Sequence, residues 1–305
     1  MNPRPPAGSM PPRVMLALLV SILIWGSTWT AIRYQLGVTQ PGWSIGFRFA
    51  VAAAAMALYA VSRGLSLRIR RDDLPLLAAI GISQFLLNFQ FIYHAEALIT
   101  SGLVAMIFAL LIVPNAILGR IFLGQRVGGA FVAGVLLAAA GMVLLFHHEI
   151  ASAAAGGGRA ALGILLVCAG TLSASVGNVL QATARAHRLP WTALLTWSMA
   201  LGAAASMMLA LAGSGWPALD ARPEYWIATA YLGLFGSAIT FPVYLYAIRM
   251  IGPARAAYAS VLVPIVAMAF STMLEGYRWT PAAAVGAALA LAGMVFALRG
   301  RASRG

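Results

Sequence analysis

Long apolar stretches alternate with short polar segments along almost the whole chain. A helix rises 1.5 Å per residue, so about 20 apolar residues match a hydrocarbon layer roughly 30 Å thick. The pattern therefore predicts an all-α integral membrane protein with ten transmembrane helices. The predicted helices cover residues 14–32, 43–62, 74–95, 101–121, 127–146, 160–182, 191–213, 224–246, 255–274 and 280–298.

The composition agrees with this pattern and excludes a soluble protein. Hydrophobic residues make up 62% of the 305 residues and charged residues only 9%, whereas soluble domains carry about 25% charged residues. The first stretch, 14–32, is too long for the core of a signal peptide and is predicted to be a retained helix. Residues 1–12 are rich in proline and are predicted to be disordered. Cys168 is the only cysteine, so no intramolecular disulfide can form.

The net charge of +13 comes entirely from arginine, because the chain has no lysine. If both termini are cytoplasmic, 15 of the 20 arginines fall on the cytoplasmic side, and Arg48 falls inside a helix. Positive charge is retained on the cytoplasmic side, so the count favours both termini inside and a multi-pass location in the plasma (inner) membrane. Scattered over short loops, the arginines form no continuous face for nucleic acid. The remaining four arginines, Arg33, Arg159, Arg222 and Arg278, fall on the side away from the cytoplasm.

The two halves of the chain resemble each other. An ordered series of matches indicates an internal duplication, with one repeat in residues 1–150 and the other in 151–305, joined by a glycine-rich linker at 147–159. At an offset of 150 the matches are Phe85 with Phe235, Phe91 with Phe241, Ala97 with Ala247, Gly102 with Gly252 and Val113-Pro114 with Val263-Pro264. Two residues further on, Gly134 matches Gly286 and Gly141-Met142-Val143 matches Gly293-Met294-Val295.

Five helices per repeat is an odd number, so the second repeat starts on the side of the membrane where the first ends. The repeats are therefore predicted to be inverted, and inverted repeats place a substrate site near the membrane midplane, at their interface. The alternative is an old duplication kept only for packing.

Several short motifs carry a resemblance to a known family. The second half contains Gly236-Ser237-Ala238-Ile239, Tyr244-Leu245-Tyr246-Ala247, Ile251-Gly252-Pro253-Ala254-Arg255-Ala256, Val263-Pro264, Leu274-Glu275-Gly276, Gly286 and Ala292-Gly293. The first half has a looser version in Trp25-Gly26-Ser27, Gly46-Phe47-Arg48, Ser101-Gly102-Leu103-Val104-Ala105 and Leu123-Gly124-Gln125-Arg126. The chain thus resembles the EamA-type proteins of the drug/metabolite transporter superfamily.

This resemblance implies two inverted five-helix repeats, both termini inside, and a central cavity lined mainly by helices 1, 3, 4, 6, 8 and 9. Many bacterial members, including the YddG-like branch, export amino acids or related metabolites. Two positions depart from the family pattern. Gln125 stands where an acidic residue is common, and Leu111-Ile112-Val113 stands where some exporters carry aromatic residues, which weakens the case for aromatic amino acids.

Polar side chains inside the predicted helices are the candidate substrate-binding groups. In hydrocarbon a polar group needs a partner or a water-filled cavity, so such residues point inward. Uncharged hydrogen-bonding groups and aromatic rings suit a small zwitterion or an amphiphilic metabolite; alternatively, the same groups join helix to helix. The candidates are Trp25, Thr28, Gln84, Asn88, His94, Ser175, Asn178, Thr240 and Tyr244.

Arg48 and two prolines have two interpretations each. Arg48 is either a clamp for a substrate carboxylate (or a partner of Glu96), or a side chain that snorkels to the membrane interface, which its shallow depth favours. Pro114 and Pro264 lie at matching positions and lack the N–H of a regular helix. They serve either as gating kinks or as fixed bends that only shape the bundle.

Other features limit the choice of partners. The glycine pairs of helices 5 and 10 predict close packing of these two helices, or a weak dimer, so the protein is expected to be a monomer or a weak dimer. His147-His148-Glu149 is the only metal-like motif and has no second cluster to complete a site, so no metal is expected. No nucleotide-binding or hydrolase motif is present, and no cofactor is expected.

These features favour a secondary transporter that exports small metabolites, most of all amino acids, by alternating access. Transport of nucleosides or sugar-like solutes is the alternative. A membrane-embedded enzyme would need clustered His, Asp or Glu at membrane depth, and the sequence has none. Proton coupling has His94 as its only deep titratable candidate.

Overall fold

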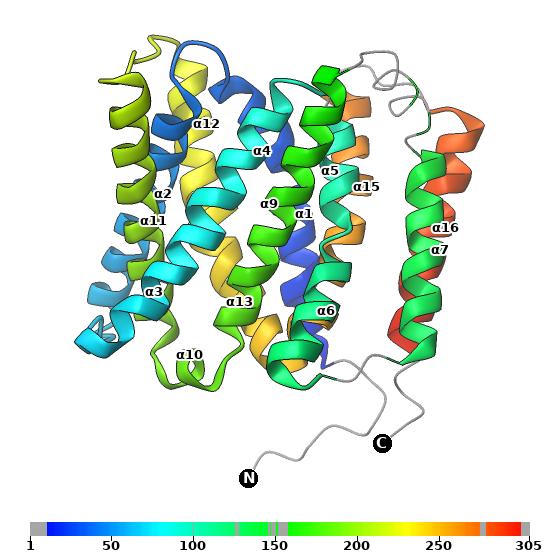
Figure 1. Cartoon of the computed structure of the whole chain (residues 1–305), viewed down its shortest axis with the longest axis horizontal. Coiled ribbons are helices and arrows are strands. Elements are labelled where there is room, and N and C mark those ends of the chain that lie inside the picture. The colour runs from blue at the N-terminus through cyan, green and yellow to red at the C-terminus, as the bar shows by residue number, and fades with distance from the viewer. Residues whose placement is uncertain are drawn as a thin grey trace.

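The described residues form one bundle of long helices that run side by side (Figure 1). The computed structural model describes residues 11–99, 101–125, 128–145, 147, 151, 158–274 and 279–299, and every regular element in these ranges is helical. Seven of the described helical stretches are long and apolar enough to cross a membrane. The prediction of an all-α integral membrane protein is therefore confirmed.

The helices follow the predicted stretches to within a few residues. Most of the bundle consists of α1 (Pro12–Gln35), α2 (Pro41–Ser62), α3 (Leu74–Ile80), η2 (Gly81–Leu87), α4 (Asn88–Glu96), α5 (Ser101–Ala109), α6 (Ile112–Leu123), α7 (Gly129–Leu145), α9 (Gly158–Gln181), α11 (Trp191–Ser214), α12 (Pro223–Gly233), η3 (Leu234–Ile239), α13 (Thr240–Ile251), α15 (Tyr258–Leu274) and α16 (Pro281–Arg299). Short elements are η1 (Arg71–Asp73), α10 (Ala184–Arg188) and α14 (Pro253–Ala256). The predicted disordered segment 1–12 and the predicted linker 147–159 lie mostly outside the described residues, as does Glu275.

Proline and glycine set several helix ends. Proline stands in the first turn of α1, α2 and α12, where its fixed φ suits a helix start and its missing N–H leaves no helical bond unmade. The predicted helix 224–246 continues five residues further, to Ile251. The chain is still apolar there except for Arg249. The helix ends only at Gly252, whose φ of +80° lies in the left-handed region.

Three of the predicted helices are not regular throughout. The stretches 74–96 and 223–251 each contain a π-helical segment, η2 and η3. The stretch 101–123 is interrupted at Leu110 and Leu111, between α5 and α6. Pro114 has no N–H for the carbonyl of Leu110, which instead accepts a bond from Val113 N at 2.9 Å. By contrast, α15 continues through Pro264.

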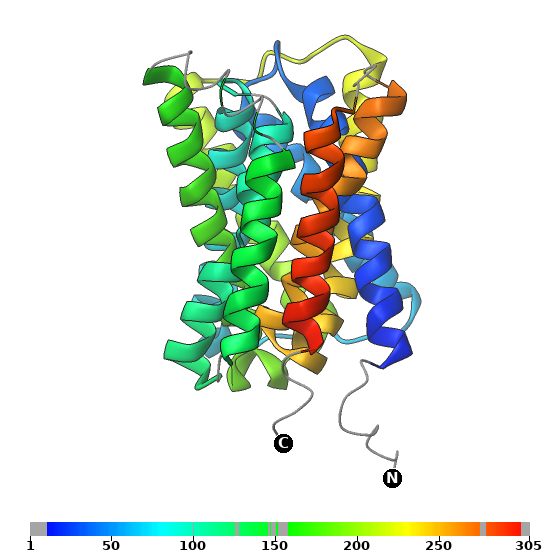
Figure 2. The ribbon, with the colours of Figure 1, turned by 90° about the vertical axis from the view of Figure 1, so that its right-hand side faces the viewer.

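Helices from the two halves of the chain pack against each other. The main pairs are α7 with α16, α2 with α11, α1 with α13 and α15, and α9 with α4 and α6. Figure 2 shows α7 and α16 side by side along their length. A Cβ at Gly141 would lie 2.7 Å from the carbonyl oxygen of Gly286, so only glycine permits this approach. The glycine faces are thus used for packing within the molecule, as one of the two sequence interpretations predicted.

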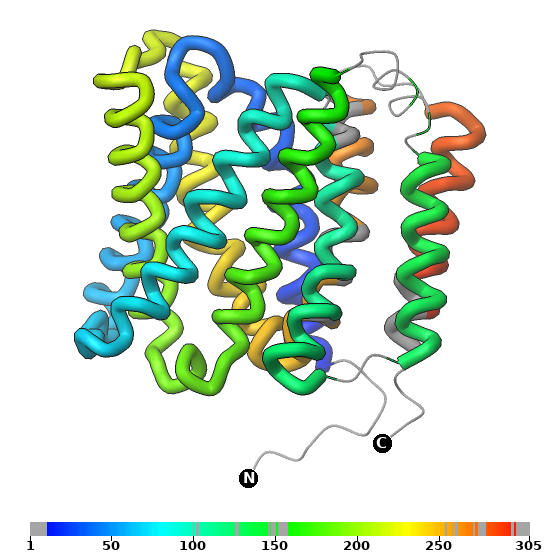
Figure 3. The backbone as a smooth tube through the Cα atoms, in the orientation of Figure 1, coloured from blue at the N-terminus to red at the C-terminus, as the bar shows by residue number. Residues whose placement is uncertain are grey.

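The two ends of the bundle differ in charge. The first helix begins and the last helix ends at the same end of the bundle (Figure 3), and α10 lies at this end too (Figure 1). We call this the arginine-rich end, because the described helix ends and loops there carry Arg13, Arg63, Arg68, Arg70, Arg71, Arg120, Arg185, Arg188, Arg249 and Arg255.

Candidate functional site

A cavity of about 70 Å³ lies in the middle of the bundle, between helices of both halves of the chain. This volume holds a few water molecules, so a larger guest needs some side-chain movement. The lining is mostly aromatic and aliphatic, with a few polar groups. It consists of Trp25, Thr28, Trp29, Ile32, Arg48, Gln84, Asn88, Phe89, Ile92, Ala105, Phe108, Leu111, Ala174, Asn178, Phe241, Tyr244 and Val263.

One wall of the cavity is built from aromatic rings. The Trp25 ring meets Tyr244 edge to face with 4.8 Å between centroids, and it meets Phe241 at 5.5 Å. Its Nε1 donates to the carbonyl oxygen of Gly236 at 3.2 Å, which fixes the ring between α1 and η3. Edge-to-face contacts of this kind hold aromatic rings in defined orientations. The wall is therefore a pre-arranged apolar surface with few degrees of freedom.

Arg48 projects from α2 into the bundle interior. The residue is 1% exposed, its Nε donates to Ser237 Oγ at 3.1 Å, and its guanidinium carbon lies 4.4 Å from the centroid of the Phe89 ring. The interpretation that this side chain snorkels to the membrane interface is wrong for this structure, because the helix face that carries Arg48 points to the other helices and not to lipid.

Several buried polar atoms around the cavity make no hydrogen bond to any described residue. Buried polar atoms are nearly always paired in proteins, with protein groups or with ordered water, so a group of unpaired ones marks a place that ordered water or a polar guest can occupy. The donors are Trp29 Nε1, Arg48 Nη1 and Asn178 Nδ2. The acceptors are Gln84 Oε1, Asn88 Oδ1 and Asn178 Oδ1.

The π-helical segments help to explain why polar groups gather here. Gln84 lies within η2 and Asn88 directly follows it, while Ser237, the partner of Arg48, lies within η3. In η3 the hydroxyl of Ser237 donates to Leu232 O, five residues back, at 2.8 Å. A π-bulge inserts one residue into a helical turn and is frequent at functional sites. Both segments therefore change the register of side chains beside the cavity.

The structure brings most of the predicted binding residues together. Six of the nine candidates line the cavity: Trp25, Thr28, Gln84, Asn88, Asn178 and Tyr244. Ser175 and Thr240 are buried but do not line it, and the Thr240 hydroxyl donates to Phe235 O. The His94 side chain is exposed, with Nδ1 2.7 Å from Gln90 O, and lies outside the cavity.

The two prolines do not line the cavity, but their neighbours do. Leu111 lies three residues before Pro114 in the interrupted turn, and Val263 directly precedes Pro264. A change of helix shape at either proline therefore changes the cavity wall.

The phenylalanine and aliphatic residues of the lining were not among the predicted binding residues. Ile32 continues the series Trp25, Thr28 and Trp29 at the spacing of one helix face, so periodicity alone pointed to it. Phe89, Phe108 and Phe241 carried no such signal, because apolar residues occupy every face of these helices.

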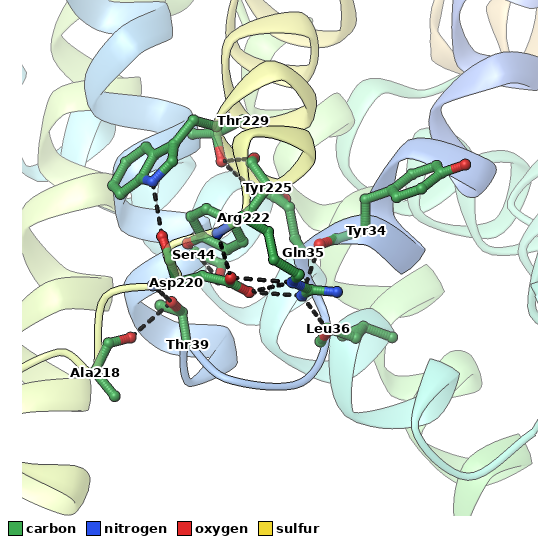
Figure 4. Close-up of polar contacts among 11 residues, drawn as sticks. Tyr34, Gln35, Leu36, Thr39, Ser44, Ala218, Asp220, Arg222, Tyr225 and Thr229 are labelled. Carbon is green, nitrogen blue, oxygen red and sulfur yellow. Dashed lines mark hydrogen bonds and ion pairs between the residues drawn. The ribbon is translucent and has the colours of Figure 1, made fainter.

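A polar cluster lies at the end of the bundle opposite the arginine-rich end (Figure 4). Arg222 Nε donates to both carboxyl oxygens of Asp220 at 3.0 Å, and its Nη2 reaches the carbonyl oxygens of Tyr34 and Leu36. The Thr39 hydroxyl donates to Ala218 O at 2.7 Å. Hydrogen bonds from Arg222 lower the pKa of the Asp220 carboxyl. The cluster ties the α1–α2 loop to the segment before α12.

No metal site is apparent among the residues that the structure describes, where no three His, Cys, Asp or Glu side chains come together. In the metal-like motif only His147 is described; His148 and Glu149 lie outside.

Comparison with known proteins gives consistent matches over most of the chain. The model of the EamA-like transporter family matches twice, at residues 12–147 and 161–299. A probable terminal-alkyne amino-acid exporter of Streptantibioticus cattleyicolor is 29% identical over 290 residues, covering 93% of this chain and 92% of the relative.

Two further relatives come from Escherichia coli K12. A probable amino-acid metabolite efflux pump is 26% identical, covering 94% of this chain and 96% of the relative. The uncharacterized inner membrane transporter YedA is 28% identical, covering 85% and 82%. A solved crystal structure that is 21% identical superposes with a TM-score of 0.77, covering 93% of this chain and 96% of that chain. That likeness concerns the fold alone.

Proposed function

The chain belongs to the EamA-like transporter family, and on this premise we propose that it exports small zwitterionic metabolites, most of all amino acids, by alternating access. It is a membrane transporter and not an enzyme.

We propose ten transmembrane helices in two inverted repeats, with both termini in the cytoplasm. The double match of the family model supports two repeats. The helix pairs support a two-fold relationship: exchanging the halves converts the contact of α1 with α15 into that of α9 with α6, and leaves α2 with α11 unchanged. The concentration of arginine at one end supports the cytoplasmic assignment of that end.

The observation that carries the substrate class is the set of unpaired donors and acceptors around one cavity. Arg48 Nη1 and Trp29 Nε1 are donors that suit a carboxylate. Gln84 Oε1 and Asn88 Oδ1 are acceptors that suit an ammonium group. An amino acid presents both groups on one carbon, and its side chain then meets the aromatic wall.

In this assignment, the free energy of substrate binding depends most on the buried charge of Arg48. A buried charge without full compensation is costly, and a charge pair with good hydrogen bonds recovers part of the desolvation penalty. No carboxylate lines the cavity among the described residues. A substrate carboxylate beside Nη1 therefore stabilises the loaded transporter, and release of the substrate restores the unpaired state.

Two named relatives add support from outside the structure. One is named a probable terminal-alkyne amino-acid exporter and another a probable amino-acid metabolite efflux pump. Their names support amino-acid export as the first substrate class to test. The substrate gradient is the proposed driving force, since no acidic side chain stands in the described cavity lining to carry a proton.

The test is uptake into proteoliposomes that contain the purified full chain and no nucleotide. A panel of radiolabelled amino acids, nucleosides and sugars identifies the class. Competition then uses two analogues of the best substrate, one without the carboxylate and one without the amine. We expect an amino acid to be transported and each analogue to compete at least tenfold more weakly. Equal competition by the amine that lacks a carboxylate would overturn the proposed role of Arg48.

Nucleosides or sugar-like solutes are the second candidate class. The amides of Gln84, Asn88 and Asn178 and the rings of Trp25 and Tyr244 also suit the hydroxyls and flat faces of such solutes. These solutes give Arg48 no anionic partner. If a nucleoside or sugar is the transported substrate, replacing Arg48 should affect its transport much less than replacing Gln84, Asn88 or Asn178.

A further inference from the structure

A second hollow opens at the arginine-rich end, on the outside of the bundle between α1, the start of α11 and the end of α13. It has a volume of about 500 Å³, far larger than the central cavity, and does not share a lining residue with it. Its walls are almost entirely apolar. They are formed by Arg13, Leu16, Ala17, Val20, Trp191, Pro242, Val243, Leu245, Tyr246 and Arg249.

The only charged groups in this lining are two guanidinium groups, those of Arg13 and Arg249. Arg249 is held in place because its Nη2 donates to Ala186 O at 3.0 Å and to Leu189 O at 3.4 Å. Its Nε is buried and makes no hydrogen bond to a described residue. The groove therefore offers two positive charges beside an apolar surface.

The groups are arranged by depth along the helices. Arg13 lies in the first turn of α1 and Val20 lies seven residues further on, a rise of about 10 Å. Arg249 lies near the end of α13, and Val243 lies six residues before it, about 9 Å deeper. Trp191 begins α11 at the same end, and tryptophan is enriched at membrane interfaces. The guanidinium groups thus lie at headgroup depth and the apolar walls reach into the acyl region.

We propose that this groove is a binding site for one anionic phospholipid of the leaflet at the arginine-rich end. The lipid phosphate lies against Arg13 and Arg249, and an acyl chain fills the apolar hollow between α1 and α13. Charge complementarity selects the occupant: two arginines favour a headgroup with net negative charge over one whose phosphate is balanced by an ammonium group. The site is separate from the transport cavity and does not depend on which substrate is carried.

The test compares lipids on the purified full chain. The protein is incubated in detergent with equal amounts of phosphatidylglycerol and phosphatidylcholine, and native mass spectrometry counts each lipid that stays bound. A juxtamembrane arginine favours anionic lipid by about fivefold, so Arg13→Gln should reduce the preference for phosphatidylglycerol by about that factor. Arg249→Gln removes the second guanidinium group. If that variant does not fold because the contacts with Ala186 O and Leu189 O are lost, Arg249→Lys keeps the positive charge.

Matched controls separate the groove from general surface charge and general lipid contact. Arg63 is an exposed arginine at the same end outside the groove, so Arg63→Gln should leave the preference unchanged. Val20→Trp fills the groove and should abolish retention of the lipid, whereas Leu19→Trp, on an exposed face of α1, should not. Equal binding of the two lipids, or equal losses in Arg13→Gln and Arg63→Gln, would overturn the proposal, as would full retention in Val20→Trp.

Discussion

The guanidinium of Arg48 lies 4.4 Å from the centre of the Phe89 ring, and this contact between α2 and α4 places a positive charge in the wall of the central cavity. The ring face compensates the charge in part, through a cation–π interaction. Nε donates to Ser237 Oγ, whereas Nη1 is buried and makes no hydrogen bond to a described residue. Charge, ring and free donor together make this the residue on which substrate recognition can be tested most directly.

Arg48→Gln should lower the rate of amino-acid uptake about 10- to 100-fold at low substrate concentration, the equivalent of one hydrogen bond to a charged group. Arg48→Lys should recover only part of the rate, since a compact ammonium cannot reproduce the planar guanidinium. The measurement is initial uptake in proteoliposomes. Arg63→Gln is the matched control, and an equal rate in Arg48→Gln and the wild type would contradict the assignment.

Asn178→Ala and Tyr244→Ala should each slow uptake without loss of membrane insertion. Asn178 supplies an unpaired donor and acceptor to the cavity, and Tyr244 supplies part of its aromatic wall. Uptake is measured at equal amounts of reconstituted protein. Ser198→Ala is the control, because Ser198 is also buried and unpaired but lies on α11, outside the cavity lining. Unchanged uptake in both variants would remove these residues from the site.

Pro114→Ala should slow transport and leave stability unchanged or slightly higher. Alanine supplies a backbone N–H at position 114 that can donate to the carbonyl oxygen of Leu110, as in a regular helix. The helices α5 and α6 can then join into one continuous helix. Initial uptake rates and the midpoint of thermal unfolding separate the two effects. Pro281→Ala, at the first position of α16, serves as a control because no helical bond is missing there. A normal rate in Pro114→Ala would identify the kink as a fixed bend and not a gate.

Gly286→Ala should lower the unfolding midpoint of the protein. The new methyl would meet the backbone of α7 at Gly141, and overpacking of this kind costs about 1–3 kcal/mol. Gly213→Ala provides the contrast, since no atom lies within 4 Å of its Cβ position in α11. Thermal unfolding of both variants in the same detergent checks the prediction. Equal midpoints would mean that α7 and α16 separate easily.

The Asp220 cluster should make stability depend on pH. Because the pKa of Asp220 is lowered in the folded protein, its contribution is fully present above the ordinary carboxyl pKa of about 4 and is lost as pH falls through the lowered value. Asp220→Asn should therefore be less stable than the wild type at pH 7, and the difference should shrink only below about pH 4. Unfolding midpoints from pH 7 to pH 3 test this, and a constant difference over that range would exclude the charged pair as its cause.

Much of this protein could be predicted from the sequence alone. The length of each apolar stretch determined the helices to within a few residues, because a continuous stretch of about 20 apolar residues matches the hydrocarbon thickness as a helix and is far too long for a spanning strand. The motifs around Gly236 and Gly252 led to the EamA-type family, and the family match confirms that prediction. Polar residues at helical spacing also pointed to most of the polar groups that line the cavity.

The tertiary structure decided what each group faces. Periodicity shows which residues share a helix face, but it does not show which neighbour that face meets, and this is why Arg48 was expected at the interface and lies inside. Two π-helical segments shift the register of side chains beside the cavity, an effect that a regular repeat of 3.6 residues does not contain. His94 is exposed and Phe89 and Phe241 line the cavity for the same reason: in a chain that is apolar on almost every face, only the packing of the helices separates the lipid side from the interior.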